Sequence, residues 1–535
     1  MSQQQCEDKG CTWIVGFPGP WCHVPTSPYI KGWSLGFEEI DTNKHQKMML
    51  DLATGSAVVI LSVVFLCQAE VVTGVAADVL AVLVFLGAAA LTRFYRLDIP
   101  NEVVFDEFYF GHMSNCYFHK QFYFDIHPPL AKLLMYAYGA LSGACPTFDF
   151  QHKVPDGENH SFTDECQYVP YRQVIAFFAT LVVPLVYLLA RRLSLTRPFA
   201  CLAASMMLYD TLLLSEGRLI LTDPVLLFFI VLSVYSCLQL WHTRPRSLAR
   251  NLWTLVTAVA CGCAFSVKFT ALATLGWVAL GSFVAYYPHL SPLSLLRCVA
   301  AAAVGVAVFC VPMYLHVHTV VNTSDHQWNL SPFYQQFLVG HPLYNPTAER
   351  PFFLRHLYDL VFRMLEANAQ SVGEHPYASR WYEWVTANGR LLSYSSHNYV
   401  EDKHGHVFIM VNPILALPVL AAFLAFFIYA LVFVRYRRTW AHVPDSLLFF
   451  LHGCAFAFGY ISNLLPYALP QRTTYVYHYL PAQFFGFMLL ALSLQRVTHA
   501  VVIPLVVGVC SEGGQGSSPA GAASSAGGGM GEGEK

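Results

Sequence analysis

The chain has 535 residues, of which 55% are hydrophobic and only 12% are charged, and its formal net charge is −2. Soluble domains carry about 25% charged residues, so this composition predicts a polytopic membrane protein. The nearly balanced charge does not favour a nucleic-acid partner. The 15 cysteines lack the paired Cys or Cys/His spacing of a zinc module, and we predict no metal site.

The N-terminal part of the chain is polar and is followed by two apolar runs. Residues 1–50 lack the basic segment and early apolar core of a cleavable signal peptide, so none is expected. The runs Leu52–Gln68 and Val71–Leu91 are each close to the roughly 20 residues that a bilayer span requires. We predict a span from the second run and leave the first undecided.

The rest of the chain contains ten more apolar runs and ends in a low-complexity tail at 511–535, which we expect to be disordered. The predicted multispan domain therefore occupies residues 51–510, with eleven spans, or twelve if Leu52–Gln68 also crosses. The further runs are Val169–Ala190, Pro198–Leu214, Leu219–Leu240, Leu252–Val267, Phe269–Tyr286, Leu296–Leu315, Val407–Val434, Leu447–Leu465, Tyr475–Leu494 and Val497–Cys510.

The basic loops predict the orientation of the spans. Arginines cluster at 191–197, at 244–250 and at 435–438, and an even number of predicted spans separates each cluster from the next. All three clusters therefore lie on one side, which the positive-inside rule makes cytoplasmic. The opposite, lumenal side receives two large loops, at about 93–168 and about 316–406.

Glycosylation sequons give an independent indication of the same orientation. Asn-x-Ser/Thr occurs at Asn159, Asn322 and Asn329, and all three sites fall in the two loops predicted to be lumenal. The first of these loops also contains Cys145 and Cys166, and an oxidising lumen would permit a disulfide between them. The three asparagines are therefore candidates for N-glycosylation.

The first lumenal loop contains the most informative polar groups of the chain. Asp106 and Glu107 are adjacent within VVFDEFYFG, and Asp125 and His127 follow in FDIHPPL. Acidic and imidazole groups at the edge of a membrane are costly to desolvate, so they indicate a functional site. The alternative is an amphipathic loop whose carboxylates are solvated.

Further polar and aromatic side chains lie near the lumenal ends of other predicted spans. Arginine offers a planar set of donors suited to a phosphate group, and a carboxylate can accept a proton from an attacking hydroxyl. This combination indicates group transfer from a lipid-linked phosphate donor at the lumenal interface. For single residues such as Arg218 or Lys268, snorkelling to the interface is the alternative. The residues are Arg172, Asp210, Glu216, Arg218, Asp223, Lys268, His375, Arg380, Trp381, Tyr382, Trp384, Arg472, Tyr477 and His478.

Seven segments in a fixed order carry a resemblance to a known family. They read TRFYRL (92–97), VVFDEFYFG (103–111), FDIHPPLAKLL (124–134), SEGRLILTDPVL (215–226), SVKFTAL (266–272), HPYASRWYEW (375–384) and YHYLPAQFFG (477–486). Over about residues 79–495 the chain resembles the protein O-mannosyltransferases, which belong to the GT-C class of glycosyltransferases. The resemblance implies an all-α polytopic fold with about 11 transmembrane helices and two large lumenal loops.

The resemblance also implies an activity. Family members of the endoplasmic reticulum transfer mannose from dolichyl-phosphate mannose to Ser or Thr hydroxyls of secretory proteins, with inversion and without a further cofactor. We expect Asp106 to act as the base, with Glu107 orienting either Asp106 or the acceptor. The donor phosphate or sugar is expected to contact Arg93, Arg172, Arg218, Arg472 and His478, with a structural role as the alternative for Arg93 and Arg172. Supporting roles are expected for Asp125, His127, Asp223, Lys268, His375, Arg380 and Trp381.

One departure from the family concerns the acceptor. Most eukaryotic members carry a lumenal MIR domain between the seventh and eighth spans, but here Gly340 is followed almost directly by the segment HPLYNPTAERPFFLRHLYDL. We therefore expect this domain to be absent. The predicted partners are the lipid-linked donor, acceptor polypeptides, membrane lipids and a second subunit, in a homodimer or a heterodimer with another family member.

Three alternative functions stay open at this point. A GT-C enzyme that uses another polyprenyl-phosphate sugar or another acceptor would need the same carboxylate and basic groups. A catalytically silent membrane subunit would retain the same motifs. A transporter is the third alternative, but the chain has no clear internal repeat and its charges gather at one face of the membrane.

Overall fold

The structure is a computed structural model, which describes most of the chain between residues 74 and 502. The described residues are 12–14, 21–23, 74–144, 146–151, 161–163, 166–284, 292–371, 373, 375, 377–398, 403–440, 443, 445–468 and 473–502. The undecided run Leu52–Gln68, the tail at 511–535 and the last predicted span beyond residue 502 lie outside the described residues. Cys145, Asn159 and Arg472 also lie outside them.

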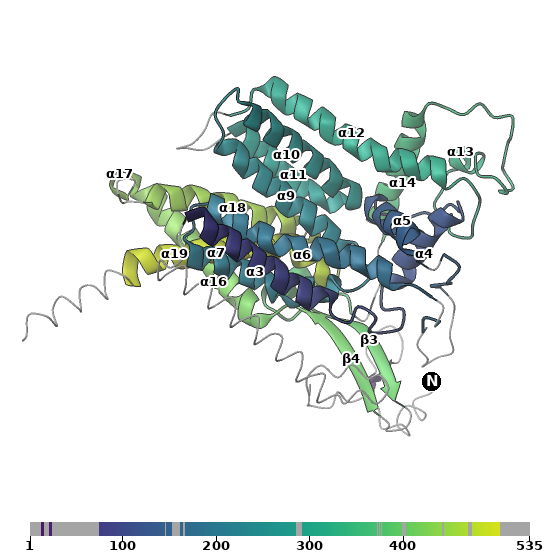
Figure 1. Cartoon of the computed structure of the whole chain (residues 1–535), viewed down its shortest axis with the longest axis horizontal. Coiled ribbons are helices and arrows are strands. Elements are labelled where there is room, and N and C mark those ends of the chain that lie inside the picture. The colour runs from purple at the N-terminus through teal and green to yellow at the C-terminus, as the bar shows by residue number, and fades with distance from the viewer. Residues whose placement is uncertain are drawn as a thin grey trace, which may run out of the picture.

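Long apolar helices confirm the predicted all-α polytopic membrane fold. Within the described residues, eight helical segments are long and apolar enough to cross a membrane. Figure 1 shows them packed side by side. They are α3 (Gly74–Phe94), α6 (Val169–Arg192), α9 (Asp223–Trp241), α10 (Leu248–Val267), α12 (Leu295–Thr319), α16 (Pro413–Arg435), α18 (Ser446–Ala468), and η2 (Val476–Tyr479) continuing through α19 (Leu480–Val497) into η3 (Thr498–Val502).

Two predicted spans begin or end differently in the structure. The run Pro198–Leu214 is not one helix: α7 (Arg197–Leu208) ends early, because Asp210 caps a separate short helix, α8 (Thr211–Glu216), by accepting a hydrogen bond from Leu213 N at 2.9 Å. The run Val407–Val434 becomes helical only at α16, where Pro413 follows the cap residue Asn412. The predicted span Phe269–Tyr286 corresponds to η1 (Phe269–Ala271) followed by α11 (Leu272–Val284).

The two large loops fold into short elements on one end of the helix bundle. The first loop contains α4 (Glu107–Phe118) and α5 (Leu130–Ser142). The second contains α13 (Pro332–Gln335), α14 (Phe353–Gln370), α15 (Trp381–Val385) and the antiparallel pair β3 (Arg390–Asn398) and β4 (Lys403–Met410). The remaining described elements are β1 (Thr12–Ile14), β2 (Trp21–His23) and α17 (Arg437–Trp440).

The two loops are joined by backbone hydrogen bonds and by a shared aromatic cluster. Phe122 N donates to Asn322 O at 2.8 Å, and Phe124 N donates to His326 O at 2.7 Å. Below these bonds, buried side chains of the first loop pack against Met313 of α12 and against α13 and α14. The first loop is therefore held between the spans and the second loop.

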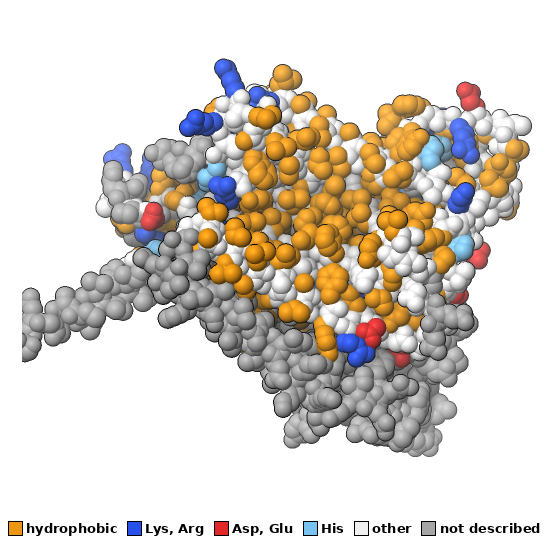
Figure 2. Space-filling view, in the orientation of Figure 1, with side chains coloured by type: hydrophobic (Ala, Val, Ile, Leu, Met, Phe, Trp, Pro, Cys, Tyr) orange, Lys and Arg blue, Asp and Glu red, His pale blue; other side chains and the backbone are white. Residues whose placement is uncertain are grey.

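The surface of the bundle agrees with a membrane environment. Figure 2 shows hydrophobic side chains covering the middle of the visible face, while most of the charged side chains lie near its edges. At the end of the bundle opposite the two loops, Asp78 of α3 pairs with Arg191 at 2.9 Å and with Arg197 at 3.2 Å. On the loop side, Cys166 is disulfide-bonded, as expected for an oxidising compartment.

Close helix contact generates a stability prediction. A Cβ atom at Gly459 of α18 would lie 2.2 Å from Phe485 of α19, so Gly459→Ala should force the ring to move and lower the free energy of unfolding by about 1–3 kcal/mol. Gly276→Ala in α11 is the matched control, because no atom lies within 4 Å of its Cβ position. Thermal unfolding followed by size-exclusion chromatography measures both variants, and an equal loss in the control would contradict the prediction.

Candidate functional site

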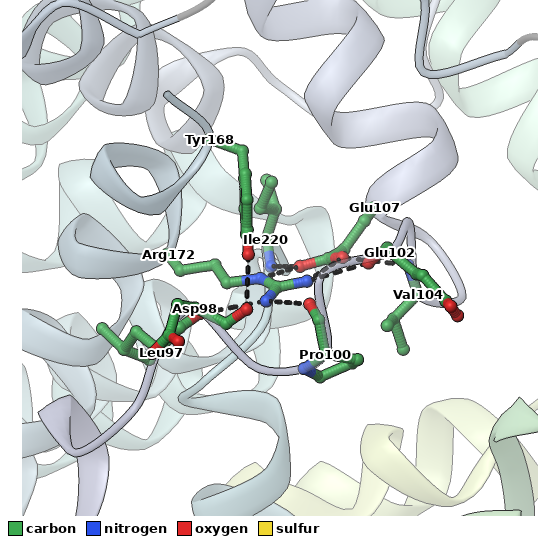
Figure 3. A network of polar contacts seen from close by, with 9 residues as sticks. All are labelled: Leu97, Asp98, Pro100, Glu102, Val104, Glu107, Tyr168, Arg172 and Ile220. Carbon is green, nitrogen blue, oxygen red and sulfur yellow. Dashed lines mark hydrogen bonds and ion pairs between the residues drawn. The ribbon is translucent and has the colours of Figure 1, made fainter. Parts of the chain in front are cut away.

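The acidic pair of the first loop is divided by the structure into two different environments. Glu107, the first residue of α4, is fully buried and forms a two-point ion pair with Arg172 of α6, with both N–O distances at 2.8 Å. Its two carboxylate oxygens also accept hydrogen bonds from Val104 N and Ile220 N, both at 2.9 Å. Glu107 thus binds the first loop to the start of α6 and to the segment before α9 (Figure 3).

Arg172 uses its whole set of donors within this network. Besides the two bonds to Glu107, it donates to the carbonyl oxygens of Leu97 and Glu102 at 3.0 Å and of Pro100 at 2.7 Å. A guanidinium group has five N–H donors, and all five are therefore used. The geometry favours the structural alternative for Arg172 over contact with a donor phosphate, and it makes Glu107 a positioning residue.

The backbone before Asp106 turns sharply. Phe105 has a φ of +49°, a left-handed conformation that bulky residues rarely adopt. Its ring lies against Tyr477 and Tyr475 of the last span, with centroid distances of 6.0 and 6.4 Å. The network around Glu107 on one side and this aromatic contact on the other fix the direction in which Asp106 emerges.

Asp106 itself is left available for chemistry. Among the described residues, no hydrogen bond or ion pair is formed by its carboxylate, and its side chain is partly exposed. Burial raises the pKa of Asp106 to about 7, Lys268 opposes this effect, and the carboxylates of Asp223 and Asp125 add to it. A carboxylate whose pKa lies close to neutral pH is suited to act as a general base.

Two buried lysine–aspartate pairs contribute charges that act on Asp106, namely those of Lys268, Asp223 and Asp125. Lys268, between α10 and η1, donates to Asp223 at the start of α9 at 2.6 Å. Lys132 of α5 is paired with Asp125 and also donates to His127 O at 3.0 Å. Both ammonium groups are almost completely buried, and of the two it is Lys268 whose charge acts on the carboxylate of Asp106.

Aromatic side chains form one wall of the site. Tyr477 lies under the Lys268 ammonium group at 5.3 Å and stacks on Tyr475 at 5.7 Å. His375 contacts Tyr475 at 5.2 Å, and the ring of His478 lies 4.5 Å from that of Tyr477. The sequence-predicted residues His375 and His478 are therefore brought to this wall.

Arg93 and Arg218, predicted as donor-binding groups, are used at helix ends instead. Arg93 is buried and donates to the carbonyl oxygens of Met207 and Leu208 at the end of α7, at 3.2 and 3.4 Å. Arg218 donates to the carbonyl oxygens of Thr92 and Arg93 at the end of α3, at 3.1 and 3.2 Å. Cations at helix C-termini satisfy unpaired carbonyl groups and oppose the helix dipole. The geometry thus favours structural roles for both.

Other predicted residues have surroundings different from those of Asp106. Arg380 is exposed at the start of α15, and Trp381 is exposed and contacts its neighbour Tyr382. Asn322 and Asn329 are half-buried, and their side-chain amides donate to His119 O at 3.4 Å and to Arg363 O at 3.2 Å.

One residue of the site, Lys132, was not selected from the sequence. Lys132 was overlooked because a lysine in an amphipathic helix is usually a solvated surface residue, although its position in HPPLAK was visible. Glu216, at the end of α8, is 1% exposed, and its Oε1 atom is buried without a hydrogen-bond partner. Burial, followed by the charge of Asp223, raises the pKa of Glu216 well above its ordinary value.

The donor atoms do not resemble those of a metal centre. Within the described residues, there is no group of three or more His, Cys, Asp or Glu side chains that could hold a metal ion. The arrangement instead offers one unpaired carboxylate with a near-neutral pKa, two buried ammonium groups and an aromatic wall. Such a set can remove a proton from a nucleophile and stabilise a nearby negative charge.

Family models match most of the chain. A model described as dolichyl-phosphate-mannose-protein mannosyltransferase matches residues 83–323, and one described as the C-terminal four-TMM region of protein-O-mannosyltransferase matches residues 353–509. Only residues 324–352 lie between the two matched regions.

A solved structure identifies the fold. The chain is similar to a chain of the Saccharomyces cerevisiae protein O-mannosyltransferase Pmt1-Pmt2 complex bound to the sugar donor, with a TM-score of 0.70 and 18% identity, covering 81% of this chain and 88% of that one. The fold is therefore that of the GT-C glycosyltransferases. Within this class, the chain belongs to the protein O-mannosyltransferase family.

Curated relatives match up to about half of the chain. The chain is 30% identical to protein O-mannosyl-transferase 2 of Drosophila melanogaster over 275 residues, which is 48% of this chain and 35% of that protein. It is 35% identical to dolichyl-phosphate-mannose–protein mannosyltransferase 6 of Candida albicans over 201 residues, covering 36% of this chain and 23% of that protein. The matched region thus spans about a third or less of these relatives.

The ion pair of Glu107 and Arg172 generates the second prediction. Arg172→Lys removes the two-point contact and several carbonyl bonds within a fully buried network, and it should lower the free energy of unfolding by about 3–5 kcal/mol. Arg96→Lys is the matched control, because the Arg96–Asp98 pair is about half exposed and contributes about 0–1 kcal/mol. Thermal unfolding compares the two, and similar losses would argue against the network.

Proposed function

We propose that this protein transfers mannose from dolichyl-phosphate mannose to Ser or Thr hydroxyls of secretory-pathway proteins, with inversion. Membership of the protein O-mannosyltransferase family supports the reaction class. The observation that carries the proposal is the unpaired Asp106 carboxylate, which lies in the field of Lys268 and of the neighbouring carboxylates at the loop end of the bundle.

The proposed chemistry is a single displacement. The acceptor hydroxyl oxygen attacks C1 of mannose, the bond between C1 and the phosphate oxygen breaks, and the hydroxyl proton passes to Asp106. The leaving dolichyl phosphate keeps the bonding electron pair, so a buried cation stabilises it. We assign this role to Lys268, because the arginines predicted for it that lie within the described residues donate to backbone carbonyls and to Glu107.

The remaining groups have positioning roles in this proposal. Glu107 and Arg172 hold the backbone at Asp106, and Lys132 and Asp125 hold the end of the first loop. Tyr477 and Tyr475 shield the site and offer rings for the sugar or the acceptor peptide. The reaction takes place at the lumenal face of the endoplasmic reticulum membrane, and no cofactor other than the donor is required.

The acceptor and the quaternary structure are part of the same proposal. The solved relative is a Pmt1-Pmt2 complex, which supports a dimer with another family member for this chain as well. Because only residues 324–352 separate the two family regions, acceptor recognition is assigned to the loops of this chain and to its partner subunit.

A transfer assay tests the activity. Membranes containing the protein are given labelled dolichyl-phosphate mannose and a Ser/Thr-rich peptide, and we expect label in the peptide with the wild type and a loss of at least about 100-fold with Asp106→Asn. Asp149→Asn, which changes an exposed carboxylate of the same loop, should retain activity. No transfer by the wild type, under conditions in which a related enzyme is active, would contradict the function. Equal transfer by Asp106→Asn would contradict only the assignment of the base.

The pH dependence tests the electrostatics. The base must be deprotonated, so kcat/KM should fall as the pH is lowered through about 7, the pKa of Asp106. The positive charge of Lys268 lowers this pKa, so Lys268→Met should move the acidic limb to higher pH in addition to weakening donor binding. Initial rates measured across this pH range with limiting donor give both profiles. An unchanged limb in Lys268→Met would argue against electrostatic contact between the two groups.

A further inference from the structure

Helix α14 has three distinct faces, although it is not one of the membrane spans. One face is buried against the aromatic cluster of the first loop and contains His356, Leu360, Met364 and Ala367. A polar face carries Arg355, Asp359, Arg363 and Glu366. The third face is apolar and exposed. We call it the exposed stripe, and it consists of Leu354, Tyr358, Phe362 and Leu365, which are 53%, 72%, 52% and 48% exposed.

The polar face is already occupied by contacts within the protein. Asp359 accepts a hydrogen bond from Ser331 at 2.6 Å, and Arg363 is paired with Glu366 at 2.9 Å. The guanidinium group of Arg355 lies over the ring of Phe333 at 4.6 Å. Asp359 and Arg355 thus contact the segment around α13, and Arg363 is paired within the helix, while the exposed stripe contains no charged side chain.

The start of α14 packs against a span whose outer surface is apolar. Phe353, at the start of α14, contacts Tyr314 of α12, with ring centroids 5.3 Å apart. On α12, Val311, Tyr314 and Leu315 are 58%, 48% and 46% exposed, as expected for side chains in contact with lipid. Figure 1 shows α14 at the loop end of α12, crossing it rather than continuing along it.

We propose that α14 is an interfacial helix whose exposed stripe lies in the membrane leaflet on the side of the candidate site. A helix in the plane of the interface places its apolar face among head groups and upper acyl chains and keeps its charges on the other side. Lipid is chosen as the occupant of the stripe because α14 packs on α12 at Tyr314, which is part of that span's exposed apolar surface.

This placement has a consequence for the first loop. The buried face of α14 packs on the cluster that contains Tyr117, Phe122 and Phe124 of that loop. Seating α14 in the leaflet therefore sets the depth of the first loop, and with it of Asp106, relative to the membrane surface. The proposal does not depend on the identity of the reaction.

Photo-crosslinking tests the proposal in the full chain. The protein carries p-benzoylphenylalanine in place of Tyr358 or Phe362 and is reconstituted in phosphatidylcholine vesicles that contain an alkyne-tagged phosphatidylcholine. After irradiation, we expect tagged lipid at both positions, at least about fivefold above the same probe at Tyr344, which is 39% exposed in the same loop outside α14. Labelling no greater than at Tyr344, or adducts with a second protein chain instead of lipid, would overturn the proposal.

A matched pair of charge substitutions gives a second readout. With the probe at position 358, Phe362→Glu should lower lipid labelling several-fold, because it places a charge in the exposed stripe. Gln370→Glu adds the same charge on the polar side of the helix and should leave labelling unchanged. If both variants label alike, the stripe does not enter the leaflet. Tagged-lipid labelling does not require turnover, so this result is independent of the transfer assay.

Discussion

The buried ion pair between Glu107 and Arg172 is the interaction on which the geometry of the candidate site depends. It connects the first loop, the start of α6 and the segment before α9, and its hydrogen bonds join residues up to 113 positions apart in the chain. Burying two charges is costly unless each forms a full set of hydrogen bonds, and here every donor of Arg172 is used. Asp106 takes no part in this network, and the carboxylate of Asp106 stays unpaired among the described residues.

The site uses charge in two different ways. Compensated charges, in the pairs Glu107–Arg172, Lys132–Asp125 and Lys268–Asp223, hold segments of the chain together. Asp106 is the uncompensated carboxylate, and its burial raises its pKa to about 7. An unpaired base beside buried cations is suited to a reaction in which a proton is removed from a neutral acceptor and a phosphate leaves.

We propose that the membrane contacts this protein not only at the spans but also at helix α14. The first loop is held between α12 and the second loop, and the exposed stripe of α14 offers the bilayer a further apolar surface. In the proposed transfer, a lipid-linked donor and a water-soluble acceptor have to meet at one depth. Fixing the loop that carries Asp106 to both the spans and the interface sets that depth.

Hydropathy alone determined the polytopic class, most span positions and the location of Asp106 at a membrane edge, because a backbone in lipid must satisfy its own hydrogen bonds as a helix. The break after Leu208 was missed, because it depends on Asp210 capping α8. Only the tertiary structure gave Asp106 and Glu107 different environments, showed Arg93, Arg172 and Arg218 bonded to backbone carbonyl groups, and placed Lys132 beside Asp125. The physical reason is that the role of a buried charge is decided by its partners, and these come from residues distant in sequence, which no local pattern specifies.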